Sequence, residues 1–180
     1  MATVVVLNGT SSSGKTTIAR VVQEIAPRLF LNFSIDSILY TLPPPILERL
    51  KRGEWAGDIR ILDLVRAFYA CVRELLALGH DLVIDHAVMT EAEAEMLKDA
   101  VHGHEVLTVG LDCPVDVLAE RERIRGDRRP GLAAAQCERV HRWLEYDLRI
   151  DSARLSPEEA AGEICDQLPG IGYGMEPQYE

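Results

Sequence analysis

The stretch LNGTSSSGKTTIA, residues 7–19, constrains the fold of this chain more than any other feature. Gly9 is followed after four residues by Gly14, Lys15 and a threonine, which satisfies the pattern GxxxxGK(S/T). A β-branched apolar run, TVVVL at residues 3–7, precedes the pattern and indicates a buried strand. Apolar residues at helical spacing follow from Lys15 onward. A strand, a glycine-rich loop and a helix in this order predict a phosphate-binding loop.

Such a loop suits phosphate because its glycines let successive backbone N–H groups point inward, and the helix N-terminus adds positive potential. Lys15 can reach the β and γ phosphates, and the hydroxyl of Thr16 can ligate magnesium. We therefore expect a nucleoside triphosphate as the ligand, with ATP and Mg²⁺ as the cofactors of the kinase interpretation developed below. The predicted nucleotide-binding residues are Gly9, Thr10, Ser11, Ser12, Ser13, Gly14, Lys15, Thr16 and Thr17. The alternative is an ordinary strand-to-helix turn with a solvated lysine, which the place of the loop after the first strand disfavours.

Strands and helices are predicted to alternate along the rest of the chain. Further strands are expected at residues 29–35, 81–88 and 105–113, with a weaker one at 146–152. Helices are expected at 58–78, 90–101, 114–126, 132–144 and 156–168, and the prolines at 43–45 predict a turn. Thr90 followed by Glu93 is typical of a capping box. This order predicts a three-layer α/β domain of the P-loop kinase type, with a mostly parallel five-stranded sheet flanked by helices.

Length and charge narrow the class of protein. The 180 residues suit a single domain, expected over 1–170, with a flexible tail at 171–180. A net charge of −10 argues against nucleic acid as a partner, because phosphate neutralisation needs clustered Lys and Arg. The four scattered cysteines are interpreted as reduced core thiols. No segment resembles a signal peptide or a membrane span, so we expect a cytoplasmic protein with no membrane partner.

Two large classes of phosphate-loop protein lack support in this chain. A GTPase normally carries an NKxD motif, and no Asn-Lys pair occurs here. An ABC-type ATPase needs its own signature and more length. The remaining class is the small-molecule kinase, which combines a phosphate loop with an acceptor pocket and an arginine-bearing lid.

A cluster of arginines in RERIRGDRRPG predicts that lid near residues 121–131. Arginines around a transferring phosphoryl group neutralise the charge of its transition state. Arg125 and Arg128, which flank the glycine turn, are the predicted catalytic arginines, ahead of Arg121, Arg123 and Arg129. The alternative is a solvated helix face on which Glu120 or Glu122 pairs with nearby arginines.

Two acids are predicted to lie at strand ends, where open α/β sheets bind ligands. Asp36 follows the second strand and could accept the proton of an attacking hydroxyl, or it could cap a helix. Asp85 closes the third strand and could hold Mg²⁺, or it could be a loop acid without a metal. His86 and His141 are more typical of structural histidines than of substrate contacts.

Several segments, taken together, resemble the chloramphenicol phosphotransferase-like family, with a looser similarity to shikimate and nucleotide kinases. The segments are VVVLNGTSSSGKTTIAR, FSIDSIL, LVIDHAV, VGLDCPVDVLAERERIRGDRRPGLAAAQ and VHRWLEYDLRID. The resemblance implies ATP-dependent phosphorylation of an antibiotic hydroxyl, with Asp36 as base and with Lys15 and Thr16 at the phosphates and magnesium. It also implies lid arginines from RGDR and a central first strand. The resemblance departs at His86, where an antibiotic-inactivating member has an acid, and at residues 41–58, which differ and are shorter.

Three functions remain open at this point. The first is transfer of the ATP γ-phosphoryl group to a small-molecule hydroxyl, for example on an antibiotic such as chloramphenicol, as a resistance mechanism. The second is a metabolic or nucleotide-sugar kinase, as zeta-toxin-like proteins are. The third is an ATP-binding regulator that transfers nothing. The sequence does not indicate the oligomeric state.

Overall fold

A computed structural model describes residues 1–54, 60–126 and 131–168 of the chain. Within these residues, five strands form one sheet in the order β2-β3-β1-β4-β5. The strands are β1 (Thr3–Gly9), β2 (Phe30–Ser34), β3 (Asp81–Asp85), β4 (Glu105–Asp112) and β5 (Leu148–Asp151). Every pairing between neighbouring strands is parallel, and β1 lies at the centre. The predicted five-stranded sheet is therefore confirmed, with parallel pairing throughout.

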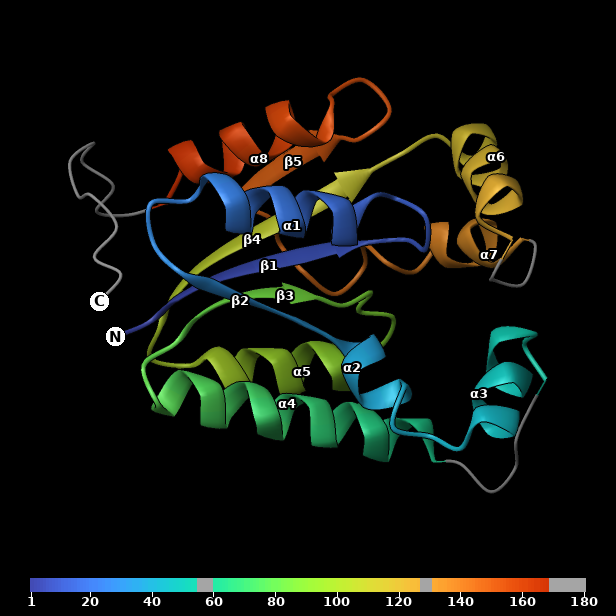
Figure 1. Ribbon diagram of the computed structural model, residues 1–180, viewed down its shortest axis with the longest axis horizontal. Helices are drawn as coiled ribbons and strands as arrows, with labels where there is room; N and C mark the ends of the chain where they lie inside the picture. Colours follow the sequence, from blue (N-terminus) through green and yellow to red (C-terminus); the bar gives the residue numbers. More distant parts are fainter. Residues whose placement is uncertain (55–59, 127–130, 169–180) are drawn as a thin grey trace.

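Helices cover both faces of the sheet (Figure 1). Helices α1 (Lys15–Ile25) and α8 (Pro157–Asp166) lie on one face, and α4 (Ile61–Ala77) and α5 (Glu91–Val101) lie on the other. Alternate residues of a strand point to opposite faces. Accordingly, Val4 and Val6 of β1 pack in the α4–α5 core, whereas Val5 and Leu7 pack in the α1–α8 core. The predicted three-layer α/β architecture is confirmed.

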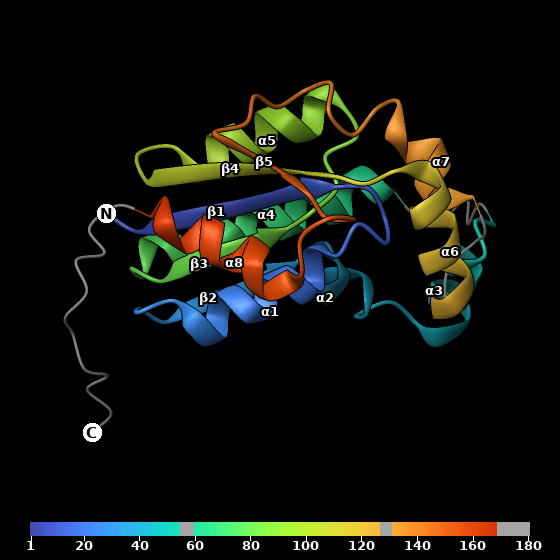
Figure 2. The same ribbon diagram turned by 90° about the horizontal axis from the view of Figure 1, so that it is seen from above.

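Four further helices lie toward the carboxyl ends of the strands: α2 (Ile35–Leu39), α3 (Pro44–Lys51), α6 (Val115–Arg125) and α7 (Leu132–Cys137). Figures 1 and 2 show α3, α6 and α7 beyond this end of the sheet, and the N-terminus at the opposite end. The loops and helices that can surround a ligand are thus gathered at the edge where parallel sheets bind one.

The structure corrects three predictions about this end. The prolines do not simply turn the chain: α3 begins at Pro44, because the first helical turn tolerates a residue without an N–H donor. The helix predicted at 132–144 ends at Cys137 and is followed by turns. The strand predicted at 81–88 ends at Asp85, which places that carboxylate at the strand end itself.

The predicted capping box at Thr90 is confirmed. The Thr90 hydroxyl accepts a hydrogen bond from the Glu93 backbone N–H at 3.3 Å, and the Glu93 carboxylate accepts one from the Thr90 N–H at 3.2 Å. The predictions about Asp58, about residues 127–130 of the lid and about the tail at 171–180 lie outside the described residues.

The cysteine prediction is half correct. All four cysteines are free thiols, but Cys71 is exposed and the other three are only partly buried; of these, Cys165 packs against the α1–α8 core. Among the described residues, no helix has the length and apolar character that crossing a membrane requires.

Candidate active site

A cavity of about 580 Å³ lies at the carboxyl ends of the strands. It brings together the phosphate loop, both predicted acids and the end of the arginine-rich helix. Its wall includes Ser11, Ser12, Ser13, Gly14, Lys15, Thr16, Thr17, Asp36, Asp85, His86, Arg121, Arg125 and Gln136. Aliphatic side chains complete another part of the wall: Leu39, Leu50, Ile61, Leu64 and Val65.

The loop between β1 and α1 has the backbone geometry of a tight anion cradle. A methyl group at Gly9 would lie 2.7 Å from the Ser13 hydroxyl and 3.0 Å from the Leu111 carbonyl oxygen, so this close approach requires glycine. Gly14, immediately before α1, has a φ of 94°, and Ser12 has a φ of 61°. A positive φ at a serine is a strained conformation, of the kind that functional loops retain.

Two serine hydroxyls in this loop lack partners. Among the described residues, Ser12 Oγ and Ser13 Oγ are buried and make no hydrogen bond. Buried polar atoms are nearly always paired, because an unsatisfied one costs about 1–3 kcal/mol. A ligand rich in hydrogen-bond acceptors, such as a phosphate group, would satisfy both hydroxyls.

Lys15 lies over the loop rather than in solvent. Its Nζ donates hydrogen bonds to the carbonyl oxygens of Gly9 at 2.9 Å and Thr10 at 2.8 Å. The same nitrogen is 4.0 Å from Asp85 Oδ1, and only 11% of the Lys15 side chain is exposed. The positive charge is therefore held at the mouth of the loop, next to a carboxylate.

Thr16 and Asp85 meet beside this lysine. The Thr16 hydroxyl donates a hydrogen bond of 2.6 Å to Asp85 Oδ2. Hydroxyl and carboxylate oxygens are ligands that Mg²⁺ prefers, and Mg²⁺ is usually held by one or two protein groups together with phosphate and water. No group of three or more His, Cys, Asp or Glu side chains suited to a metal occurs in the described part of the chain. The oxygen pair therefore fits a phosphate-associated Mg²⁺ rather than a fully protein-bound metal.

Asp36 lies in the first turn of α2 and lines the cavity. The N-cap of this helix is Ser34, whose hydroxyl accepts a hydrogen bond from the Asp36 N–H at 3.3 Å. The alternative interpretation of Asp36 as the capping residue is therefore wrong. Because the cap is provided by Ser34, the Asp36 carboxylate is not needed for capping and is half-exposed at the cavity.

The arginines of α6 differ in their surroundings. Arg125, the last residue of α6, lines the cavity. Arg121 also lines it and donates to the Ser12 carbonyl oxygen at 3.4 Å and to the Ser152 carbonyl oxygen at 2.7 Å. Arg123 forms an exposed ion pair with Glu120 at 2.7 Å. The interpretation as a solvated helix face thus holds for Arg123, whereas Arg121 contacts the phosphate loop. Arg128 and Arg129 lie outside the described residues.

Sequence reasoning missed two residues that join α6 and α7 to this site. Glu122 of α6 is 5% exposed, and its carboxylate accepts hydrogen bonds from the N–H groups of Gly131 at 3.0 Å and Ala133 at 2.7 Å. Gln136 of α7 accepts one from the Ser11 N–H at 2.6 Å. No local pattern indicates the second contact, because its partners are 125 residues apart.

His86 is a buried neutral group at the cavity wall. It is 4% exposed, and its Nδ1 lies 2.8 Å from the Tyr69 hydroxyl. Burial, together with repulsion from Lys15, lowers the pKa of His86 to about 3. Burial raises the pKa of Tyr69, so this phenol stays protonated. Neither group is poised to exchange protons near neutral pH.

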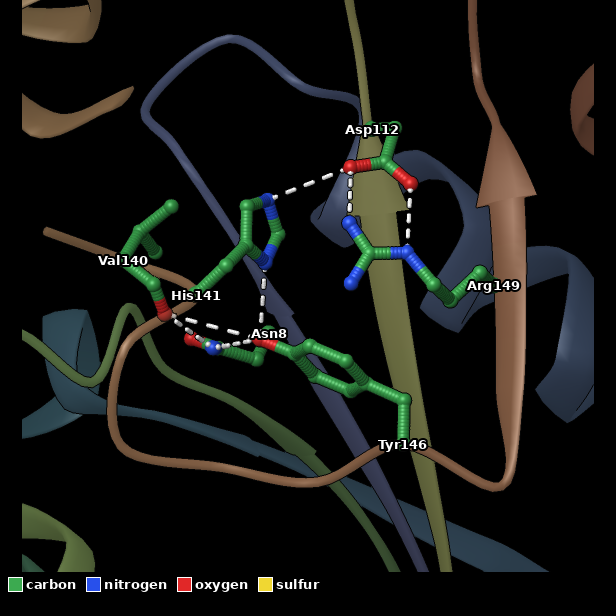
Figure 3. A network of polar contacts seen from close by, with 6 residues as sticks. All are labelled: Asn8, Asp112, Val140, His141, Tyr146 and Arg149. Carbon is green, nitrogen blue, oxygen red and sulfur yellow. Dashed lines mark hydrogen bonds and ion pairs between the residues drawn. The ribbon is translucent and has the colours of Figure 1, made fainter. Parts of the chain in front are cut away.

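A polar network supports β1 directly before the loop (Figure 3). The Asn8 amide donates to the Val140 carbonyl oxygen at 2.7 Å and to the Tyr146 hydroxyl at 2.6 Å, and its oxygen accepts from the Val88 N–H at 2.9 Å. His141 Nδ1 lies 2.7 Å from the same Tyr146 hydroxyl.

The network continues to the end of β4. His141 Nε2 lies 3.5 Å from Asp112, which also pairs with Arg149, as Figure 3 shows. Burial is the main cause that lowers the pKa of His141. His141 is not among the residues that line the cavity, and its contacts are those of a structural residue.

Comparisons with known proteins agree with this geometry. A family model described as chloramphenicol phosphotransferase-like protein matches residues 2–169. A protein of Mycobacterium tuberculosis (strain H37Rv), provisionally named an O-phosphotransferase, is 29% identical over 95% of this chain and 84% of its own length.

Two solved structures share the fold. A sugar kinase from Janibacter sp. HTCC2649 has a TM-score of 0.71 and 22% identity, and the match covers 92% of this chain and 93% of that one. A gluconokinase from Sinorhizobium meliloti 1021 has a TM-score of 0.64 and 21% identity, over 90% and 93% of the two chains. The predicted kinase-type fold is therefore confirmed. The chain belongs to the chloramphenicol phosphotransferase-like family.

Proposed function

We propose that this protein transfers the γ-phosphoryl group of ATP to a hydroxyl group of a small organic molecule. The observation that carries the proposal is the single cavity that unites the phosphate loop, Asp36 and Arg125. If ATP and the acceptor alcohol both bind in this cavity, the transferred phosphoryl group lies between the phosphate loop with Lys15 and the Asp36 carboxylate. Membership in a family of phosphotransferases supports the same reaction.

The loop residues hold the donor in this proposal. The backbone N–H groups of Ser12 and Gly14 and the hydroxyls of Ser12 and Ser13 donate to phosphate oxygens. Lys15 exchanges its two carbonyl contacts for the β and γ phosphates. Arg125 neutralises the charge that spreads over the transferred group in its transition state. Arg128 is proposed for the same role from the sequence.

Asp36 serves the acceptor. Its carboxylate orients the acceptor hydroxyl and accepts its proton as the oxygen attacks phosphorus. A carboxylate in the first turn of a helix is also favoured by the positive end of the helix dipole.

Thr16 and Asp85 are the proposed magnesium site. Thr16 lies in the first turn of α1 and its hydrogen-bond partner Asp85 at the end of β3, next to where the phosphates of a nucleotide in the loop would end. When bound, Mg²⁺ neutralises phosphate charge and orients the phosphate tail. Asp85 also holds Lys15 in position through the 4.0 Å charge contact.

The acceptor is proposed to be an alcohol with a substantial apolar portion, such as an antibiotic. The support is the aliphatic part of the wall, which consists of the buried Val65 and the half-buried Leu39, Leu50, Ile61 and Leu64. Burial of apolar surface contributes about 25 cal/mol per Å² to binding, so such a wall favours apolar ligands over fully hydroxylated ones.

An acceptor-dependent ADP-release assay tests the proposal. Purified protein with Mg·ATP is tested against a panel of hydroxylated antibiotics, sugars and nucleotide sugars, and products are examined by mass spectrometry for an added phosphate. We expect ADP release with apolar alcohols, which the Asp36→Asn substitution slows by a factor of about 10²–10⁴. Selective activity on sugars would favour the metabolic kinase. Tight ATP binding with no acceptor-dependent ADP release across the panel would favour the regulator.

A further inference from the structure

Gln136 makes a contact that orients its side chain. The residue lines the cavity, and its Oε1 accepts a 2.6 Å hydrogen bond from the Ser11 N–H of the phosphate loop. A backbone N–H can only donate, so the side-chain amide must turn its oxygen toward Ser11. The NH₂ group, which carries two donors, is therefore directed away from Ser11. Among the described residues, no other hydrogen bond of this side chain occurs.

The helix that carries Gln136 is held in place from the neighbouring helix. The buried carboxylate of Glu122 accepts hydrogen bonds from Gly131 and Ala133, which fixes the start of α7 on α6. Helix α6 is in turn joined to the loop, because Arg121 donates to the Ser12 carbonyl oxygen. Gln136 is thus positioned by a connected set of contacts and not by one flexible side chain.

The phosphate loop next to Gln136 carries hydrogen-bond donors and a positive charge that call for a ligand with hydrogen-bond acceptors. The buried hydroxyls of Ser12 and Ser13 have no partners within the described ranges, and Lys15 brings a positive charge. A phosphate group offers only acceptor oxygens and negative charge. A fixed amide with two available donors on the same wall complements such a group without adding charge.

We propose that Gln136 is a phosphate-binding residue: the Ser11 N–H holds its oxygen, and its NH₂ group donates to the phosphate tail of the bound nucleotide. This inference rests on the proposed function, because it takes a nucleoside triphosphate as the ligand of the loop. Gln136 of α7 would thus add a neutral hydrogen-bond donor to the phosphate-binding groups already proposed, which are Lys15 and the lid arginines.

Titration calorimetry with Mg²⁺ and the non-hydrolysable analogue AMP-PNP tests the inference. Gln136→Met removes the donors and should weaken binding about fivefold, the worth of one neutral hydrogen bond. Gln136→Glu still accepts from Ser11 but lacks donors and brings a negative charge, so we expect binding to weaken about tenfold or more. Ala135→Glu places the same charge on the exposed neighbouring residue and should change affinity less than about twofold.

A purely structural role for Gln136 predicts the opposite order. In that case Gln136→Glu, which keeps the Ser11 contact, would bind like the unchanged protein, and Gln136→Met would bind more weakly. Gln136→Lys gives a second comparison, because it loses the acceptor but keeps donors. Tighter binding by a folded lysine variant than by the methionine variant supports the inference, and binding no tighter than that of the methionine variant overturns it.

Thermal unfolding of each variant establishes that it is folded before binding is measured. If the unchanged protein does not bind Mg·AMP-PNP, the proposed function fails and this inference falls with it. If the unchanged protein binds and the order of the methionine and glutamate variants is reversed, only this inference fails.

Discussion

Thr16 and Asp85 are joined by a 2.6 Å hydrogen bond between the first turn of α1 and the end of β3. The two residues are 69 positions apart, but their elements are neighbours because β1 and β3 pair in parallel. Parallel pairing brings the carboxyl ends of adjacent strands to the same edge. The same geometry places Lys15 next to Asp85, so the Lys15 ammonium, the Thr16 hydroxyl and the Asp85 carboxylate form one cluster.

Replacement of the Thr16 hydroxyl should raise the magnesium requirement. We expect Thr16→Val to increase the Mg²⁺ concentration for half-maximal activity about tenfold, because one ligand oxygen is lost. Thr16→Ser keeps the oxygen and is the matched control. The measurement is initial rate against Mg²⁺ at fixed ATP. Equal magnesium dependence in the valine and serine variants would show that Thr16 does not hold the metal.

Lys15 and Asp36 should separate donor binding from turnover. Lys15→Ala should weaken ATP binding and lower kcat about a hundredfold or more, because charge at the phosphates is lost in both ground and transition states. Asp36→Asn should leave the ATP dissociation constant within about twofold and lower kcat by about 10²–10⁴. Calorimetry and steady-state rates give the two quantities. Equal loss of nucleotide affinity in both variants would contradict these roles.

Arg125 and Arg123 provide a matched pair on one helix. Arg125 lines the cavity, whereas Arg123 pairs with Glu120 at the surface. We expect Arg125→Ala to reduce kcat about a hundredfold through lost transition-state charge stabilisation. Arg123→Ala should change kcat less than about twofold and leave stability nearly unchanged, because water screens an exposed ion pair. The functional assignment of the α6 end fails if both substitutions have the same effect on kcat.

Gly110 should not tolerate a side chain. A methyl group there would lie 2.9 Å from the Tyr146 ring, in the network that supports Asn8. Gly110→Ala should therefore lower the free energy of unfolding by about 1–3 kcal/mol. Gly162→Ala, in α8, where the added group would meet nothing within 4 Å beyond the adjoining helix backbone, should raise it by about 0.5–1 kcal/mol. Urea unfolding measures the free energy of unfolding of both variants. An unchanged free energy in Gly110→Ala would mean that the Tyr146 ring moves aside without cost.

His86 should make the protein less stable in acid. Its pKa is about 3 in the folded state against an ordinary 6.5, so the unfolded chain binds a proton at higher pH than the folded chain does. The contribution of neutral His86 is complete above pH 6.5 and is lost as the pH falls toward 3. We expect a loss of up to about 1.4 kcal/mol per pH unit in this window.

The His86→Asn variant keeps a polar group for Tyr69 but has nothing to titrate. The difference in unfolding free energy between the two proteins should therefore shrink steadily from pH 6.5 downward if the unchanged protein is the more stable at neutral pH. Urea unfolding at several pH values measures this difference. Parallel stability curves would show that His86 is protonated without penalty in the folded protein.

Local sequence determined the parts of the site that are contiguous. Gly9, Gly14, Lys15 and Thr16 belong to one strand–loop–helix unit, whose backbone conformation follows from neighbouring residues. Asp85 could be placed because a buried apolar run must end at the edge of a parallel sheet. The alternation of strands and helices was sufficient for the three-layer architecture, but not for α3, since three prolines fit a turn and a helix start equally well.

The tertiary structure alone decided which distant side chains meet the loop. Gln136 contacts Ser11 across 125 residues, and Asn8 contacts Tyr146 across 138. The sequence alone does not distinguish the surroundings of Arg121 from those of Arg123, yet Arg121 contacts the phosphate loop and Arg123 is exposed to solvent. The phosphate loop could be predicted from the sequence because its geometry depends on adjacent residues. The contacts around it could not be predicted, because they depend on how packed helices bring remote positions of the chain together.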